Sequence, residues 1–241
     1  MSSETEENKN VELTREELEK LTPEQLQKIK EAQEAEQAAE LDLGTLPGDY
    51  FLNARTNFFE YNNVIWIADV IDRMQGLGVI QKLLFLAAQI EDKTKPIKIF
   101  VSSPGGECNA GFAIIDCMEE VKKRGITIET VAIGDCCSMA SVILSAGSKG
   151  HRYVYPSTRI MIHESGVMET GGKFSDMRTV TKELQISTDL MAKIYAKATG
   201  KTVDECREAM NHDNYMSANE AKKFGLVDKI KVPLVLMGPN G

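Results

Sequence analysis

The sequence predicts an α/β fold in which helices cover a mainly parallel sheet. Two observations predict this fold class. Apolar runs of strand length alternate along the chain with longer runs of helical period. No apolar run approaches the roughly 18 residues of a membrane span, so the apolar segments are expected to form a buried core. Such strand–helix alternation favours parallel strands joined by crossover helices.

Five strands are expected in the body of the chain. "VIWIA" reads as a buried strand, and "IKIFVSS" is a strand that runs into the turn "PGGE". "IETVAIG" is a third, and a Pro-Ser-Thr turn separates the two short strands "RYVY" and "RIMIH". In chain order the five strands occupy residues 64–68, 97–103, 128–134, 152–155 and 159–163.

Six helices are expected between and after these strands. "VIQKLLFLAAQIED" has helical period and exceeds the length of a typical strand, and an amphipathic helix further on is closed by Gly125. A long helix ends before Gly200, and Thr and Ser caps begin the last two helices. In chain order the helices occupy residues 79–92, 110–125, 138–146, about 174–198, 202–211 and 217–225.

Charge divides the chain into a tail and a body. Residues 1–42 carry thirteen acidic and five basic side chains, a net charge of −8 that equals the net charge of the whole chain. Glycines and a proline at 43–49 mark a boundary. We therefore predict an acidic, partly helical or disordered tail at 1–48, a folded domain at 49–233 and a short C-terminal tail at 234–241.

Composition also excludes several classes of protein. A neutral body with an acidic tail does not suggest nucleic-acid binding, and no basic, apolar secretory signal begins the chain. The five cysteines include no C-x-x-C pair, which indicates reduced thiols rather than a disulfide framework or a zinc site. We expect a cytoplasmic protein without membrane contact.

Two features at strand ends are candidates for chemistry, because open α/β sheets place their sites there. In "SPGG" (103–106), two glycines allow backbone N–H groups to approach an oxyanion. In "DCCSMAS" (135–141), Ser138 lies at a strand-to-helix junction, with the N–H of Met139 facing the same space. Ser138 is either a helix cap or a nucleophile; Ser141 and Ser145 are rivals that the helix carries away from the junction.

A serine nucleophile needs a base, and the base needs a carboxylate that orients it. Of the three histidines, His163 ends a strand, whereas His151 and His212 lie in turns. The candidate carboxylates are Asp213, Asp135 and Asp176. Composition and spacing leave the choice among them open.

Four segments in order resemble the ClpP family, the proteolytic subunits of Clp proteases. The resemblance covers about residues 55–231. The family pattern joins an S-P-G-G turn to an A-S-M-x-A nucleophile segment and two later motifs. The segments read "VIWIADVIDRMQGLGVIQKLLFL", "SSPGGECNAGFAIIDCM", "CSMASVILSAGSKGHRYVYPSTRIMIH" and "HDNYMSANEAKKFGLVDKI". The resemblance implies a ClpP/crotonase-like fold of repeated strand-strand-helix units with a protruding handle helix at about 174–198.

The resemblance also implies an activity and a role for each site residue. The activity is that of a serine endopeptidase in which Ser138 is the nucleophile, His163 the general base and Asp213 its orienting acid. Gly106 and Met139 supply the N–H groups of the oxyanion hole. No cofactor is implied for this chain, because ATP is used by a partner unfoldase.

Family members form two stacked seven-membered rings around a chamber, so the resemblance implies a homo-oligomer, a tetradecamer of stacked heptameric rings. A hexameric AAA+ unfoldase feeds unfolded polypeptide substrates into such a chamber. The segment 164–173 resembles the strand that lines the substrate groove, where a peptide adds as an extra strand.

The chain departs from the family pattern in its acidic tail, in His212 where an arginine is usual, and in Cys136 and Cys137 before the nucleophile, whose modification would block the site. Three alternatives therefore stay open: a phage-type capsid-maturation protease, a catalytically idle structural ring subunit and a crotonase-type enzyme that binds acyl-CoA. The complete Ser-His-Asp set argues against the last. A Ser-Lys signal peptide peptidase is disfavoured by the absence of a signal or membrane anchor.

Overall fold

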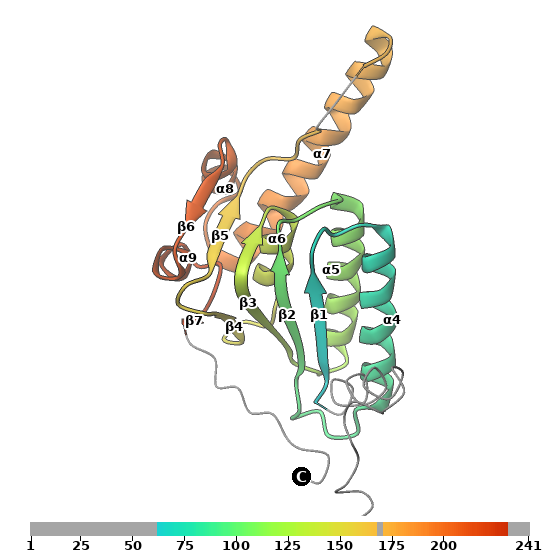
Figure 1. Ribbon diagram of the computed structural model, residues 1–241, viewed down its shortest axis with the longest axis vertical. Helices are drawn as coiled ribbons and strands as arrows, with labels where there is room; N and C mark the ends of the chain where they lie inside the picture. Colours follow the sequence, from blue (N-terminus) through green and yellow to red (C-terminus); the bar gives the residue numbers. More distant parts are fainter. Residues whose placement is uncertain (1–61, 168–170, 231–241) are drawn as a thin grey trace, which may run out of the picture. The chain divides into compact units, whose positions relative to one another are not determined.

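A parallel sheet is the centre of the fold, as the sequence predicts (Figure 1). A computed structural model describes residues 62–167 and 171–230. The predicted tail, the start of the predicted domain and the C-terminal tail lie outside the described residues. The domain boundaries therefore stay predictions.

The sheet has one continuous row of parallel strands in the order β1, β2, β3, β4, β7. Two further strands, β5 and β6, leave this row: β5 pairs in parallel with β3, and β6 pairs antiparallel with β5. The bounds are β1 Val64–Ala68, β2 Ile97–Ser103, β3 Ile128–Cys137, β4 Arg152–Val154, β5 Arg159–Ile162, β6 Asn214–Met216 and β7 Lys229–Ile230.

Helices follow most strands and cover one face of the sheet. Their bounds are α4 Arg73–Gln89, α5 Cys108–Lys123, α6 Met139–Ser145, α7 Phe174–Thr199, α8 Val203–Met210 and α9 Ala218–Phe224. The main core joins Ile67 of β1 and Val101 of β2 to Leu83 of α4 and Ile114 of α5. Alternate residues of the strands face the opposite side, where Trp66 stacks on Phe100 with ring centroids 4.8 Å apart. The α/β fold class predicted from the sequence is confirmed.

The strand β3 divides its pairing between two neighbours. Its first half, 130–132, pairs with β4, and its second half, 135–137, pairs with β5. The chain therefore leaves the main row of the sheet at the end of β3, and β5 and β6 follow it (Figure 1). This division decides which residues meet at the carboxyl end of β3.

The helix α7 corresponds to the predicted handle helix and is 26 residues long. Its C-terminal half packs into the core through Met191, Ala192 and Tyr195. Residues 171–179, by contrast, are all exposed, and Figure 1 shows this end of the helix extending away from the sheet. The helix ends at Gly200 in the left-handed conformation, as predicted.

The structure differs from the sequence-based expectations at several boundaries. The helix predicted at 79–92 begins at Arg73, because the Asp72 side chain caps it by accepting a hydrogen bond from the N–H of Gln75 at 2.7 Å. Two glycines in its first turns lower the helix propensity there, so the sequence pattern does not indicate that the helix begins at Arg73. The strand predicted at 128–134 continues to Cys137 because its second half pairs with β5. The strands β6 and β7 have three and two residues, too few for a detectable pattern.

A buried ion pair joins β4 to the segment before β7. The Arg152 side chain is 1% exposed and makes a bidentate contact with Asp228, through Nε at 2.9 Å and Nη2 at 2.7 Å. Burial alone would raise the pKa of Asp228, but hydrogen bonds from Arg152, its charge and the N–H groups of Arg152 and Gly150 outweigh burial and hold that pKa below its usual value. The pair therefore stabilises the folded chain only while Asp228 is ionised.

We expect Asp228→Asn to lower the free energy of unfolding by about 3–5 kcal/mol at neutral pH, because Arg152 stays buried without a countercharge. A carboxyl group with a lowered folded-state pKa stabilises the fold above its unfolded pKa of about 3.9 and loses this effect as the pH falls. The variant should therefore lose less stability than the wild type on acidification. Denaturant unfolding followed by circular dichroism at several pH values measures both effects.

The matched control is Asp204→Asn, which breaks an exposed pair. Asp204 is 90% exposed and contacts Arg207 at 2.6 Å, so its loss should cost at most about 1 kcal/mol. Equal destabilisation by the two substitutions would contradict the assignment of Asp228 as the stabilising partner.

Candidate active site

Three loops meet at the carboxyl ends of β2, β3 and β5. The Ser-Pro-Gly-Gly turn follows β2, Ser138 follows β3 and His163 follows β5. Because these strands are parallel, their carboxyl ends lie at one edge of the sheet, where α/β proteins place their sites. The sheet thus brings together the two features that the sequence analysis selected.

Ser138 precedes α6 but does not cap it with its side chain. Its φ is +53°, a strained conformation for a residue with a side chain, and such strain costs on the order of 1–3 kcal/mol. The hydroxyl instead lies 2.7 Å from Nε2 of His163. The sequence left a cap and a nucleophile as alternatives, and the side chain has the contact that a nucleophile needs.

Strand register places the imidazole and the carboxylate beside this hydroxyl. Cys137 pairs with Met161 across β3 and β5, so Ser138 lies next to the end of β5. Ile162 pairs with Asn214 across β5 and β6, so His163 and Asp213 are opposite one another. The distance from His163 Nδ1 to Asp213 Oδ1 is 3.1 Å. These contacts have the geometry of a Ser-His-Asp triad.

The other candidate carboxylates have different places. Asp135 lies within β3, where it aligns with Arg159 of β5. Asp176 belongs to the first turn of α7 and accepts a hydrogen bond from the N–H of Lys173 at 3.1 Å. The structure therefore selects Asp213 as the partner of His163. The sequence left this choice open because β6, which aligns Asp213, is too short to predict.

The two glycines after β2 allow the turn to lie directly against Ser138. Gly105 has a φ of +106°, and a Cβ there would lie 2.6 Å from the Ser138 Cβ. Gly106 has a φ of +153°, and a Cβ there would overlap the Ile71 carbonyl oxygen. The bridge between Ile71 and this turn uses the N–H groups of Ile71 and Glu107, so it does not consume the N–H of Gly106.

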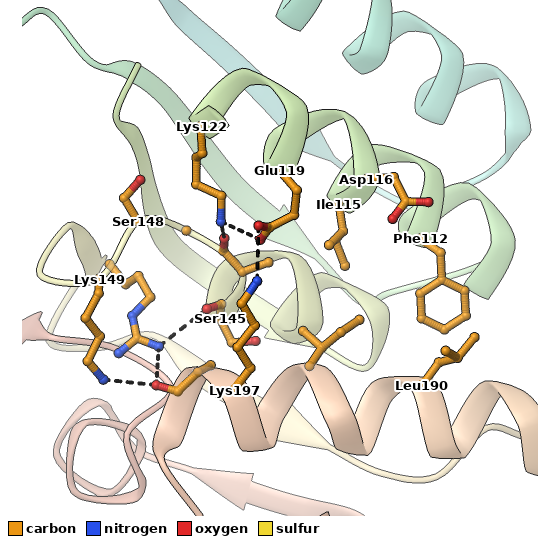
Figure 2. Close-up of a pocket in the computed structure, with 15 residues that line it drawn as sticks. Phe112, Ile115, Asp116, Glu119, Lys122, Ser145, Ser148, Lys149, Leu190 and Lys197 are labelled. Carbon is orange, nitrogen blue, oxygen red and sulfur yellow. Dashed lines mark hydrogen bonds and ion pairs between the residues drawn. The ribbon is translucent and has the colours of Figure 1, made fainter. Parts of the chain in front are cut away.

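A separate cavity of about 580 Å³ lies between α5, α6 and α7, away from the triad (Figure 2). Several of its charged groups have protein partners. Glu119 contacts both Lys122 and Lys197, and Lys149 donates to the carbonyl of Ala198. Because Glu119, Lys122, Lys197 and Lys149 are engaged in this way, we place the candidate site at the strand ends and not in this cavity.

Comparison with known proteins identifies the family. The chain matches the family model described as Clp protease over residues 48–233. An ATP-dependent Clp protease proteolytic subunit of Bdellovibrio bacteriovorus is 40% identical over 155 residues, which cover 64% of this chain and 71% of that protein. The chain belongs to the Clp protease family and is a Clp-type protease. Within the described residues, no helix has the length and apolar character needed to cross a membrane.

We expect Gly105→Ala to slow the reaction of Ser138 with a fluorophosphonate by about a hundredfold, because displacing a reacting group by about 1 Å has an effect of this size. The added methyl group would lie 2.6 Å from the Ser138 Cβ, closer than two such carbon atoms can approach, so Ser138 would have to move. Gly150→Ala is the matched control, since Gly150 also has a positive φ of +85° but has open space around its Cβ position. Labelling rates of the folded variants measure the difference, and equal rates would contradict the steric argument.

The cysteines that precede Ser138 are not readily reached. Cys136 and Cys137 are 0% and 8% exposed. Burial raises the pKa of both thiols, which reduces the thiolate that reacts with alkylating agents. The hypothesis that their modification blocks the site therefore applies to a locally opened chain rather than to the native fold.

We accordingly expect iodoacetamide to modify the partly exposed Cys108 about tenfold or more faster than Cys136 in the native chain. Mass spectrometry of digested samples measures both rates. In denaturant the modification rates of Cys108 and Cys136 should become similar. This comparison controls for any difference in intrinsic reactivity between the two thiols. Faster modification of Cys136 in the native chain would contradict the protection that its burial predicts.

Proposed function

We propose that this Clp-type protease is a serine endopeptidase in which Ser138, His163 and Asp213 form the catalytic triad. One observation carries the proposal: the Ser138 hydroxyl contacts His163 Nε2 at 2.7 Å instead of capping α6. A serine that only ended a strand and began a helix would not need a strained backbone and an imidazole partner.

In the proposed reaction, the proton of Ser138 moves along its contact with His163. In the proposed tautomer, the Nδ1–H group of His163 donates a hydrogen bond to Asp213, which leaves Nε2 free to accept the Ser138 proton. The serine oxygen then attacks the peptide carbonyl and forms an acyl-enzyme, while His163 returns the proton to the leaving amine. Water, activated by the same imidazole, releases the acyl group. The N–H groups of Gly106 and Met139 stabilise the oxyanion of each tetrahedral intermediate.

Asp213 has an unusual place for the third member of a triad. In the single chain its side chain is 62% exposed, and that of His163 is 32% exposed. A carboxylate in water stabilises an imidazolium less than a buried one does, because the high dielectric weakens the attraction. We propose that a second copy of the chain covers this edge in the assembled protease.

Exposed apolar side chains support such an assembly. Leu77, Leu84 and Phe85 are each about half exposed on α4, and Ile186 and Leu190 are each about two-fifths exposed on α7. Large apolar side chains exposed on a helix are favoured at contact surfaces between chains. We propose that copies of the chain form stacked heptameric rings, a tetradecamer in total.

A protease closed inside rings needs its substrates unfolded. We propose that a hexameric AAA+ unfoldase delivers them and uses the ATP, while this chain needs no cofactor of its own. The described residues 164–167 after His163 belong to no strand, and the N–H groups of Glu164 and Ser165 already donate to Met210 and Thr188. We therefore propose that an extended peptide pairs with the backbone that follows them, from Gly166 onward. The five free cysteines support a reducing compartment such as the cytoplasm.

We expect a fluorophosphonate to label the assembled wild-type chain on Ser138, and Ser138→Ala to abolish labelling and lower peptide cleavage by about 10⁴-fold or more. The adduct is located by mass spectrometry of the digested protein. An assembled, folded wild-type ring that remains unlabelled would refute the peptidase and favour the idle ring subunit.

Asp213→Asn tests the third member of the triad, with Asp135→Asn as its matched control. Loss of the orienting carboxylate should lower kcat by up to about 10⁴-fold, less than for Ser138→Ala if Asp213 stays exposed. The Asp135 variant should keep wild-type kcat. Equal effects of the two substitutions would remove Asp213 from the triad.

A further inference from the structure

The hydroxyl of Ser141 lies between the two segments that carry the nucleophile and the base. Its oxygen is 2.6 Å from the carbonyl oxygen of Ser138 and 2.9 Å from the carbonyl oxygen of Met161, two residues before His163. A third neighbour is the hydroxyl of Tyr195, at 2.7 Å. Ser141 is fully buried and Tyr195 is 1% exposed, so these groups have no contact with solvent.

Counting protons gives each hydroxyl a direction. Carbonyl oxygens only accept, and each hydroxyl has one proton to donate. If Ser141 donated to Tyr195, neither carbonyl would receive its proton. The arrangement is satisfied when Tyr195 donates to Ser141 and Ser141 shares its one proton between the Ser138 and Met161 carbonyls. Burial raises the pKa of Tyr195, which keeps this donor protonated at all working pH values.

The contacts act on the part of the backbone that is strained. Ser138 keeps a φ of +53° because its N–H donates to the Met161 carbonyl at 2.8 Å and its own carbonyl accepts from Ser141. The same Met161 carbonyl therefore holds both Ser138 and Ser141. A strained conformation persists only where its surroundings fix it in this way.

We propose that Ser141 and Tyr195 are positioning residues that hold the Ser138 hydroxyl and His163 at their reactive distance. This inference rests on the proposed function, since it assigns the two residues an effect on that same reaction. Neither hydroxyl touches the substrate or the reacting atoms. Tyr195 comes from α7, so this helix contributes to the geometry of the site as well as to the core.

The test compares Ser141→Ala, Tyr195→Phe and the double variant with the matched control Ser145→Ala. Ser145 lies one turn further along α6, is 2% exposed and donates to the carbonyl of Val142 at 2.8 Å. The Ser145→Ala variant therefore removes a buried hydroxyl of the same kind, but one that has no contact with the segment around Ser138. Cleavage of a quenched fluorescent peptide gives kcat and KM, and native mass spectrometry checks assembly.

We expect Ser141→Ala to lower kcat by about 10- to 100-fold with little change in KM, since a small misplacement of reacting groups has this effect. Tyr195→Phe should lower kcat less, and the double variant should equal Ser141→Ala because the hydroxyls act in series. Values are expressed per folded, assembled chain, so a loss of stability alone would not lower them. Wild-type kcat in both single variants, or an equal loss in Ser145→Ala, would overturn the proposal.

A crystal structure of Tyr195→Phe, or of Ser141→Ala where that variant folds, gives a readout that does not need activity. We expect the Ser138 Oγ to His163 Nε2 distance to lengthen beyond the roughly 3.2 Å limit of a good hydrogen bond. An unchanged triad in these variants would overturn the proposal even if the wild type cleaves peptides. An inactive wild type with a displaced triad in the variants would instead refute only the proposed function.

Discussion

The site depends first on the divided pairing of β3. If β3 paired along its whole length with β4, His163 would not lie beside Ser138, because β5 would have no place in the sheet. The parallel register of β3 with β5 places Ser138 beside His163, and the antiparallel register of β5 with β6 places His163 beside Asp213. Backbone hydrogen bonds between strands are therefore enough to bring three residues that are distant in sequence close together. Contacts between their side chains are not needed for this.

Backbone pairing alone does not aim the Ser138 hydroxyl. The left-handed φ of Ser138 turns it away from the end of α6 and toward His163, and this conformation is unfavourable for a serine. Two hydrogen bonds hold Ser138 in this conformation, one from its N–H to the Met161 carbonyl and one from the Ser141 hydroxyl to its own carbonyl. Gly105 also packs closely against it. Such strain, fixed by a dense set of buried contacts, is what a preorganised site requires.

The sequence predicts most elements of this fold but not the detail that completes the site. The spacing of apolar residues predicts the longer strands and helices, because the residues that an element buries recur with the period of that element. It misses β6, whose three residues carry too little pattern, and with it the reason to prefer Asp213 over Asp135 and Asp176. It also sets Ser141 aside as a residue that the helix carries away from the junction. That direction leads into the core, where Tyr195 meets it, and a contact so distant in sequence has no local signal.

The helix α7 joins these observations, because several hydrogen bonds connect the half of it that packs into the core to the rest of the fold. Tyr195 meets Ser141, the Thr188 hydroxyl accepts from the N–H of Ser165 at 3.1 Å, and the Ala198 carbonyl accepts from the buried Arg152 at 3.1 Å. The first two contacts reach the segments on either side of the triad. The opposite end of α7, up to residue 179, is exposed. If copies of the chain assemble as proposed, a partner that bound the exposed residues of α7 would contact the same helix whose other half touches the Ser141 and Ser165 side of the site. This would give the proposed assembly a physical route to the reactivity of Ser138.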